Sequence, residues 1–254
     1  GQYCYAPYAK MHGYEIEFVA VADPHKGRRE KFVQDYHVPA EGVFETAEQF
    51  FARPRMADAV LICTQDSQHY AYACQAIDLG YSILLEKPIS PSVRECLDLQ
   101  RRAEEKGTQI MVCHVMRYTK FYRKLKELID SGTIGQLVSI QHIESVGYWH
   151  MAHSFVRGNW SRSEDSCPMI LAKCCHDMDI LIWLTGKRAR YVSSSGNNYL
   201  FRAEKAPAGA AQRCMDCAVR AGCPYDAVRY YLESGRTSVR AGRVHWPINV
   251  LDPH

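Results

Sequence analysis

The sequence predicts an α/β protein whose first half forms a doubly wound parallel sheet and whose second half forms a separate domain. In residues 1–118, apolar runs of strand length alternate with segments of helical periodicity, which is typical of parallel sheets covered by helices. This alternation stops near residue 119. The 254 residues are enough for two domains with cores of their own, and we place these domains at residues 1–118 and 119–254.

The first half opens on Gly1 with a segment that we expect to be helical as far as Met11. Four apolar runs then predict strands, and helical periodicity separates each run from the next. Gly107 is placed where a helix should end. The expected strands are 14–22, 57–64, 82–86 and 109–115, and the further expected helices are 28–36, 69–79 and 92–106.

The second half has a different pattern. Residues 137–146 alternate apolar and polar side chains, which predicts a strand in a sheet with one face in water, as in antiparallel sheets. Residues 147–166 combine Tyr, Trp and His with Gly, Asn and Ser and have no periodicity. We expect a long loop there, and long loops in compact domains are usually functional. Helices are expected at 120–131 and 169–184.

Composition argues against several classes of partner. Apolar residues make up 47% of the chain, and the formal net charge is only +3, with the basic residues scattered, so we expect no nucleic-acid partner. No apolar run reaches the roughly 18 residues that a membrane span needs, so we expect no membrane association. The eleven cysteines are odd in number and several lie in apolar runs, which favours reduced, buried thiols and a cytoplasmic location.

The most informative stretch is the expected strand at 82–86 with the tripeptide Glu86-Lys87-Pro88 at its end. Open parallel sheets bind ligands in the crevice outside the carboxyl ends of their strands, so we expect Lys87 to point into such a crevice. Pro88 ends the strand and restricts the backbone of the lysine before it. The alternative is an ordinary surface lysine at a strand end.

A dinucleotide site of the Rossmann type needs a glycine-rich turn and, about 20 residues later, an acidic residue that binds the ribose. Gly1 and Asp23 have this spacing if Gly1 is the third glycine of the motif. The first strand would then precede Gly1, so we expect a fragment of a longer protein, cut at both ends. Asp23 favours NAD, whereas Lys26, Arg28 and Arg29 keep NADP open. The alternative role for Asp23 is a helix N-cap.

Several motifs occur in the order found in one enzyme family. The run Asp58–Thr64, then His69, Gly80, Glu86-Lys87-Pro88, Arg117 and His176-Asp177-Met178-Asp179 resemble the Gfo/Idh/MocA oxidoreductases over roughly residues 1–200. The resemblance implies a Rossmann domain, a C-terminal α/β domain with an open, mostly antiparallel sheet, NAD(P) and a sugar or polyol substrate. It also implies that Thr64, His69 and Glu86 lie beside the cofactor, that Lys87 lies in the active site, and that the protein forms homo-oligomers.

The resemblance also points to the helix expected at 169–184. The family usually carries an aspartate one turn before the histidine, but here Ala172 stands there and Lys173 follows. In a continuous helix Lys173, His176 and Asp177 share one face. We expect His176 to be the catalytic base, Lys87 to stabilise the reacting oxygen and Lys173 to add positive potential. The alternative is a histidine packed on an amphipathic helix beside a surface Lys173–Asp177 pair.

Substrate-binding candidates lie in the expected long loop and near the catalytic candidates. Aromatic rings stack on sugar faces, and arginine or histidine binds hydroxyl or carboxylate groups. The candidates are Arg117, Tyr148, His153, Arg157 and Asp177, with Tyr118, Trp149 and His150 beside them.

Cys214, Cys217 and Cys223 form the other constellation. Two cysteines separated by two residues present two thiolates to one ion, and the third could add a ligand, so zinc or an iron–sulfur cluster is a candidate. No fourth ligand is obvious. The alternative is reduced cysteines without metal, or a single disulfide.

The sequence therefore predicts an NAD(P)-dependent dehydrogenase or reductase that acts on the CH–OH groups of a sugar or polyol. One alternative is a lyase or glycosidase in which transient oxidation of a sugar carbon enables elimination and NAD is recycled. Another is a non-catalytic regulatory protein that binds a sugar or a nucleotide.

Overall fold

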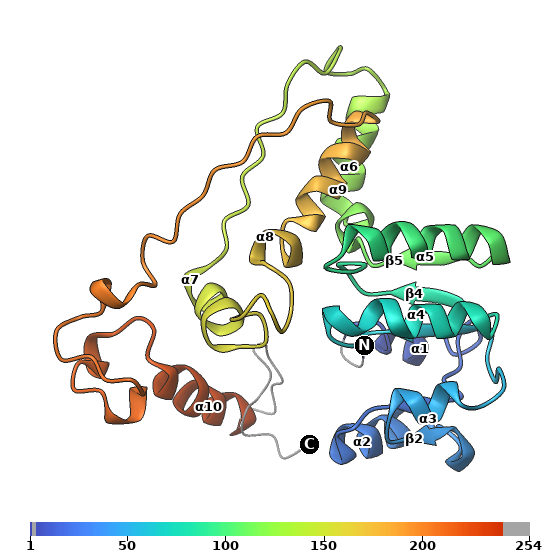
Figure 1. The fold of residues 1–254 in the computed structure, drawn as a ribbon, viewed down its shortest axis with the longest axis horizontal. Coiled ribbons are helices and arrows are strands. Elements are labelled where there is room, and N and C mark those ends of the chain that lie inside the picture. The colour runs from blue at the N-terminus through green and yellow to red at the C-terminus, as the bar shows by residue number, and fades with distance from the viewer. Residues whose placement is uncertain (2–3, 241–254) are drawn as a thin grey trace. The chain divides into compact units, whose positions relative to one another are not determined.

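Two compact units make up the chain in its computed structural model, which describes residue 1 and residues 4–240 (Figure 1). The first unit consists of residues 1–144 and 162–188. The second unit consists, within the described residues, of residues 145–161 and 189–240. Every strand assigned in the described residues belongs to the first unit.

Five short strands form two separate parallel sheets in the first unit. β3 (Ala59–Ile62), β4 (Ser82–Leu85) and β5 (Ile110–Val112) form one sheet in that order, and β1 (Val21–Ala22) pairs with β2 (Val43–Phe44). Across the described residues no ladder joins β1 to β3. The strand expected at 14–22 shrinks to its last two residues because the ladder to β2 reaches only Val21 and Ala22.

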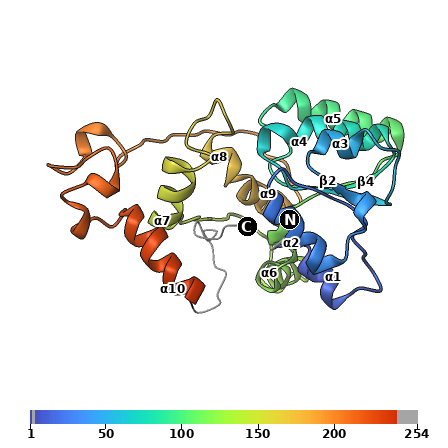
Figure 2. The same ribbon diagram turned by 90° about the horizontal axis from the view of Figure 1, so that it is seen from below.

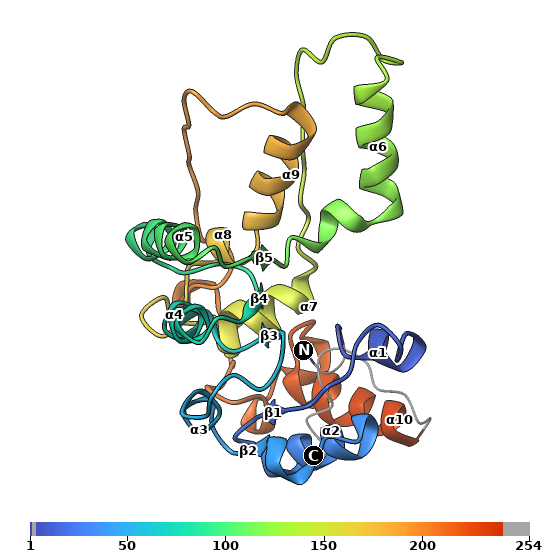
Figure 3. The ribbon, with the colours of Figure 1, turned by 90° about the vertical axis from the view of Figure 1, so that its right-hand side faces the viewer.

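The longer helices of the first half confirm the helical periodicity, and α5 ends at the glycine expected there. At the start of α5 (Val93–Lys106), the side chain of Ser92 accepts a hydrogen bond from the Glu95 amide. Gly107 ends the helix at φ 66°, which glycine adopts without strain. Figures 2 and 3 show α4 and α5 together on one face of the β3-β4-β5 sheet. The other helices are α1 (Pro7–Met11), α2 (Lys26–Tyr36), α3 (Ala47–Phe51), α4 (His69–Asp78), α6 (Lys120–Asp130), α7 (Tyr148–His150), α8 (Met169–Ala172), α9 (Cys175–Thr185) and α10 (Ser234–Arg240).

The main core lies between this sheet and helices α4 and α5. Leu85 of β4 and Ala73 of α4 have no exposed surface, and Leu99 of α5 is 3% exposed. Tyr81 is buried beside them, and its hydroxyl accepts a hydrogen bond from the Met56 amide at 3.1 Å. Burial of one large apolar side chain contributes about 1.5 to 3 kcal/mol. This core fixes the strand that leads into Glu86 and Lys87.

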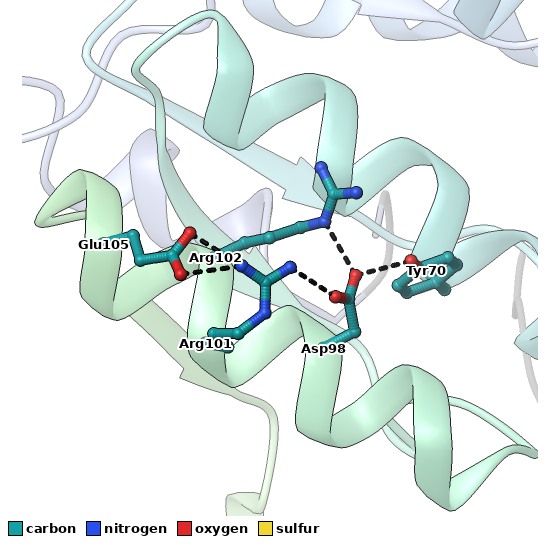
Figure 4. Close-up of polar contacts among 5 residues, drawn as sticks. All are labelled: Tyr70, Asp98, Arg101, Arg102 and Glu105. Carbon is teal, nitrogen blue, oxygen red and sulfur yellow. Dashed lines mark hydrogen bonds and ion pairs between the residues drawn. The ribbon is translucent and has the colours of Figure 1, made fainter.

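A polar network fastens α4 to α5 at the surface (Figure 4). The carboxylate of Asp98 accepts hydrogen bonds from the Tyr70 hydroxyl, from Arg101 and from Arg102, each at 2.7 Å. Arg101 also donates to both oxygens of Glu105. The bond from Tyr70, followed by those from the two arginines, holds the pKa of Asp98 well below its usual range, and Asp98 raises the pKa of Tyr70 to about 12.

The second half departs from three sequence-based expectations. The helix expected at 169–184 is interrupted by a turn at Lys173 and Cys174, between α8 and α9; Lys173 keeps right-handed helical dihedrals, whereas Cys174, at φ −81° and ψ 1°, departs from them. Residues 137–146 form no ladder, and the described chain after β5 contains no strand, so the antiparallel sheet does not form there. An extended segment needs a neighbouring strand to become part of a sheet, and alternation alone does not supply one.

The second unit is built mainly of short helical turns. The loop expected at 147–166 contains α7 and a π-helical segment at Met151–Arg157, because its aromatic side chains pack on the later chain. A second π-helical segment, Val228–Glu233, leads into α10. None of the described helices is both long enough and apolar enough to cross a membrane.

Two leucines of α5 test how the core is built. Leu99→Ala should lower the free energy of unfolding by about 2 to 5 kcal/mol, because it leaves a cavity in the core. Leu97→Ala, on the same helix but 63% exposed, should change it by no more than about 0.5 kcal/mol. Urea unfolding followed by circular dichroism measures both values, and equal losses would contradict the packing described.

The network around Asp98 predicts a pH dependence of stability. Because the pKa of this carboxyl is lower in the folded than in the unfolded chain, its stabilisation is complete above the unfolded pKa of about 4 and is lost as the pH falls. The thermal midpoint of the unchanged protein should therefore exceed that of Asp98→Asn at pH 7, and the difference should shrink between about pH 5 and pH 2. Asp58→Asn is the control, since Asp58 is fully exposed; a constant Asp98→Asn difference would refute the prediction.

Candidate active site

The site is built around Lys87, which follows β4 after one intervening residue. The Lys87 ammonium donates a hydrogen bond to the backbone carbonyl of Ala172, the last residue of α8, at 3.1 Å. The two residues are 85 positions apart. None of the carboxylates in the described residues lies within ion-pair distance of this ammonium. Lys87 is half-buried and is held by a neutral oxygen.

Two imidazoles lie near this ammonium. The rings of His114, which follows β5, and His176, in the first turn of α9, meet edge to face with their centroids 5.9 Å apart. The Nδ1 atom of each ring is buried and has no hydrogen-bond partner among residues 1 and 4–240. Burial, and then the charge of Lys87 together with His114 and Lys173, lowers the pKa of His176. Burial likewise lowers the pKa of His114, so both rings are neutral near pH 7.

The break between α8 and α9 supplies the carbonyl that holds Lys87. In a continuous α-helix the Ala172 carbonyl would accept from the amide of His176. Here that amide donates to the Lys173 carbonyl at 3.4 Å. The Ala172 oxygen is thus available to the Lys87 ammonium, and the Cys175 thiol also lies 3.8 Å from it.

The other charged candidates of this region are engaged in ion pairs. Arg117 donates two hydrogen bonds to Asp179, at 2.7 and 2.5 Å. The ammonium of Lys173 lies 3.1 Å from a carboxylate oxygen of Glu144. The Lys173–Asp177 pair considered from the sequence is wrong.

Asp177 instead accepts a hydrogen bond from His142 Nε2 at 2.6 Å. Its other oxygen is buried and has no partner in the structure. Together with the break in the helix, this means that Lys173, His176 and Asp177 do not share one helical face.

Glu86 is linked to Gly1 through Tyr5, in the turn that precedes α1. The Tyr5 hydroxyl donates to one oxygen of Glu86 at 2.5 Å, and the Lys87 amide donates to the other at 3.1 Å. The Gly1 carbonyl accepts from the amides of Cys4, Tyr5 and Ala6. Burial is the main reason that the pKa of Tyr5 is raised.

His69 fixes the loops that follow β3 and β4. It is completely buried, and its two ring nitrogens lie 2.7 Å from the Pro88 carbonyl and 3.1 Å from the Thr64 carbonyl. The side chain therefore joins the end of one strand to the end of the next. It holds these loops through their backbone, while Thr64 itself is exposed.

A buried thiol and a buried carboxylate meet behind these loops. The Cys167 thiol donates to Asp66 at 2.9 Å, and burial, followed by this bond, raises its pKa to about 12. The thiol is therefore protonated at neutral pH.

Asp23 lies directly after β1, at the carboxyl end of the strand. One of its carboxylate oxygens accepts from the His25 amide at 2.8 Å. The N-cap of α2 is His25, whose ring accepts from the Arg28 amide, so the N-cap alternative for Asp23 is wrong.

An acidic side chain after β1 and a hydroxyl side chain after β3 lie at the strand ends where doubly wound sheets bind dinucleotides. Asp23 offers the acceptor that a ribose diol needs, and Thr64 is exposed and offers a hydroxyl. The residues present therefore fit the ribose and nicotinamide portions of NAD.

Three of the substrate-binding candidates belong to the second unit. His153 Nδ1 and the Tyr231 hydroxyl are hydrogen-bonded at 2.6 Å, and the Arg157 guanidinium donates to the Tyr225 carbonyl. Tyr148 packs edge to face on Tyr225. These contacts are internal to that unit, and they join the segment 145–161 to the later chain.

The cysteine constellation also belongs to the second unit. Cys214 Sγ accepts a hydrogen bond from the Ala227 amide at 3.5 Å, and Cys214, Cys217 and Cys223 all carry free thiols. Over residues 1 and 4–240 the structure contains no group of three or more His, Cys, Asp or Glu side chains arranged to hold a metal ion. The three cysteines are therefore not brought together as ligands there.

Sequence reasoning did not single out His114, His142 or Glu144. His114 follows β5 much as Lys87 follows β4, so the rule that strand ends converge would have found it. No sequence signal connects His142 and Glu144 to a helix about thirty residues later, because only the folded chain brings them together.

The sequence matches two family models that together span most of the chain. The model described as an oxidoreductase family with an NAD-binding Rossmann fold matches residues 1–114. The model described as the C-terminal alpha/beta domain of that oxidoreductase family matches residues 126–221. Both models describe the Gfo/Idh/MocA oxidoreductases.

Individual relatives show the same similarity. The Bacillus subtilis protein YteT, named as an oxidoreductase, is 29% identical over 89% of this chain and 54% of its own length. A 2,7-anhydro-N-acetylneuraminate hydratase of Mediterraneibacter gnavus is 26% identical over 73% of this chain and 47% of its own. The myo-inositol dehydrogenase of Lactobacillus casei, solved with NAD(H) and myo-inositol, superposes with a TM-score of 0.51 at 25% identity, covering 67% of this chain and 47% of that one.

The chain spans about half the length of the curated relatives that it matches. The matches to both family models agree with the structure, in which strands and helices alternate through the first half and β4 ends at Glu86-Lys87-Pro88. The chain belongs to the Gfo/Idh/MocA family of oxidoreductases, with an NAD-binding Rossmann domain followed by a C-terminal α/β domain.

Proposed function

We propose that the full-length protein is an NAD(P)-dependent oxidoreductase that transfers hydride between nicotinamide and a hydroxyl or keto carbon of a sugar or polyol. The observation that carries this proposal is the ammonium of Lys87 beside the neutral imidazole of His176, at the carboxyl edge of the sheet. An alcohol dehydrogenase needs both a cation for the developing alkoxide and a neutral base for the hydroxyl proton.

The cofactor-binding residues lie at the ends of the strands. NAD, when bound, supplies the hydride acceptor, and Asp23, Thr64 and Glu86 are the residues that would hold it. The carboxylate of Asp23 disfavours a 2′-phosphate, so we propose NAD in preference to NADP. His69 acts indirectly, because it fixes the Thr64 and Pro88 backbones.

Lys87 and His176 have different roles at the reacting oxygen: the first donates hydrogen bonds to it, and the second exchanges a proton with it. The ammonium has three donors, and the Ala172 carbonyl takes one of them, so two remain for a substrate oxygen. His176 is neutral and can accept the hydroxyl proton during oxidation or return it during reduction. The charge of Lys173 helps to keep this ring neutral.

The relatives support the polyol class and a second candidate. The Lactobacillus casei structure contains myo-inositol, a cyclic polyol, and this supports a polyol as the substrate. Another relative is named as a hydratase, a class of enzyme whose reaction has no net oxidation, and this keeps as the second candidate an elimination enabled by transient oxidation with the cofactor regenerated. Accumulation of NADH during turnover of a polyol panel would favour the dehydrogenase, whereas product formation without net NADH would favour the second candidate.

Replacement of either central group should remove turnover. Lys87→Met and His176→Ala should each lower kcat/KM by about 100-fold or more, because each removes a group acting on the reacting oxygen. The affinity for NAD, measured by calorimetry, should change little. Lys106→Met, an exposed lysine of α5, is the control. Near-normal turnover in both site variants would refute the proposal.

The lowered pKa of His176 predicts the pH profile. In the direction of alcohol oxidation, kcat/KM should fall as the pH decreases through an apparent pKa that lies below 6.5, since the base must be neutral. Lys173→Met should move this limb to higher pH, because the ammonium lowers the pKa of His176. A limb above 6.5 that Lys173→Met does not move would show that another group is the base.

A further inference from the structure

Two side chains from one extended segment reach the break between α8 and α9. His142 donates to Asp177 at 2.6 Å, and Glu144 lies 3.1 Å from the ammonium of Lys173. They are two positions apart, so both point to the same side of an extended chain. One contact lies in the break and the other in the first turn of α9, on either side of His176.

Both contacts are partly or fully shielded from water, so each can stabilise the backbone path between α8 and α9. Asp177 is 8% exposed, so the bond from His142 is made away from water, where loss of one partner leaves a buried charge. Lys173 and Glu144 are about one-third exposed or less. Four charged or titratable side chains therefore meet at the turn between α8 and α9. They are His142 and Glu144 from the extended segment, and Lys173 and Asp177 from about 30 residues later in the chain.

The broken helix is what makes the Ala172 carbonyl available to Lys87. If α8 and α9 joined in a regular helix, the amide of His176 would take this carbonyl. A carbonyl oxygen can accept two hydrogen bonds, so the Lys87 ammonium would then have to share with that amide its only hydrogen-bond partner among the described residues. The position of Lys87 relative to His176 therefore depends on the path of the chain at Lys173 and Cys174.

We propose that His142 and Glu144 are positioning residues that hold the α8–α9 break, and through it the Lys87–His176 pair. The inference rests on the proposed function only for its kinetic consequence, because the geometry of the break concerns the chain alone. Glu144 acts through Lys173, and His142 acts through Asp177.

The pKa of the His176 imidazole should depend on Glu144. The groups that face this ring are Lys87 and Glu86 from the end of β4, His114 from the end of β5, and Lys173 from the break. Glu144 neutralises one of them. Removing the carboxylate leaves the Lys173 charge unpaired, and an unpaired positive charge lowers the pKa of a nearby histidine.

The test is a histidine NMR titration of the full-length protein without NAD or substrate, with His176 assigned from its own variant. Glu144→Gln should lower the pKa of His176 by about 0.3 to 0.5 pH unit. Adding Lys173→Met should raise it again, because the unpaired ammonium is gone. Glu127→Gln is the matched control, since Glu127 also pairs with a lysine, Lys124, on exposed α6. This control should leave the pKa unchanged.

Measurements of kcat and KM, on variants of Glu144 and of His142, complete the test. Where turnover is measurable, Glu144→Gln should lower kcat more than it changes KM. His142→Ala should lower kcat by about tenfold or more, and His142→Gln, which keeps an N–H donor, should restore part of it. An unchanged His176 pKa in Glu144→Gln, or an equal shift in Glu127→Gln, would overturn the inference even if Lys87 and His176 prove catalytic. If Glu144→Gln fails to fold, a His142→Ala protein with an unaltered His176 pKa and kcat overturns it equally.

Discussion

One hydrogen bond, from the Lys87 ammonium to the Ala172 carbonyl, determines how the rest of the site is arranged. It joins the end of β4 to the end of α8, at the turn that separates α8 from α9. An ammonium bound to a neutral oxygen keeps its full charge available, whereas an ion pair with a carboxylate would offset it. Burial is the main reason that the pKa values of the neighbouring His114 and His176 are lowered, and the charge of Lys87 lowers both further.

The remaining charges of the region are compensated locally. Arg117 pairs with Asp179, Lys173 with Glu144, and Glu86 is bound by Tyr5 and by the Lys87 amide. These pairs remove alternative partners for the Lys87 ammonium. Among the described residues of this site, the Lys87 ammonium therefore has no carboxylate partner, and the imidazoles of His114 and His176 lie near it, which supports the proposed alcohol oxidation.

The sequence predicted those parts of this arrangement that depend on local signals. The β4 strand, its Glu86-Lys87-Pro88 end and the capped helix α5 followed from apolar runs, Ser92 and Gly107. The break at Lys173 was not predictable, because neither glycine nor proline marks it and the partners that hold it lie about 30 residues earlier. Residues 137–146 have the alternation of a strand, but pairing is a property of two segments, so the pattern alone predicted a sheet that the described residues lack.

The Lys87–Ala172 bond also explains why the two domains of the family must be considered together. Lys87 lies in the stretch matched by the NAD-binding model, while Ala172 and His176 lie in the stretch matched by the C-terminal model, yet all three belong to one compact unit. The Lys87–His176 pair therefore exists only where the end of a Rossmann strand meets a helix of the second domain. A change in either domain that moves the α8–α9 break alters the charge beside His176, and so the chemistry, even when the cofactor-binding residues remain in place.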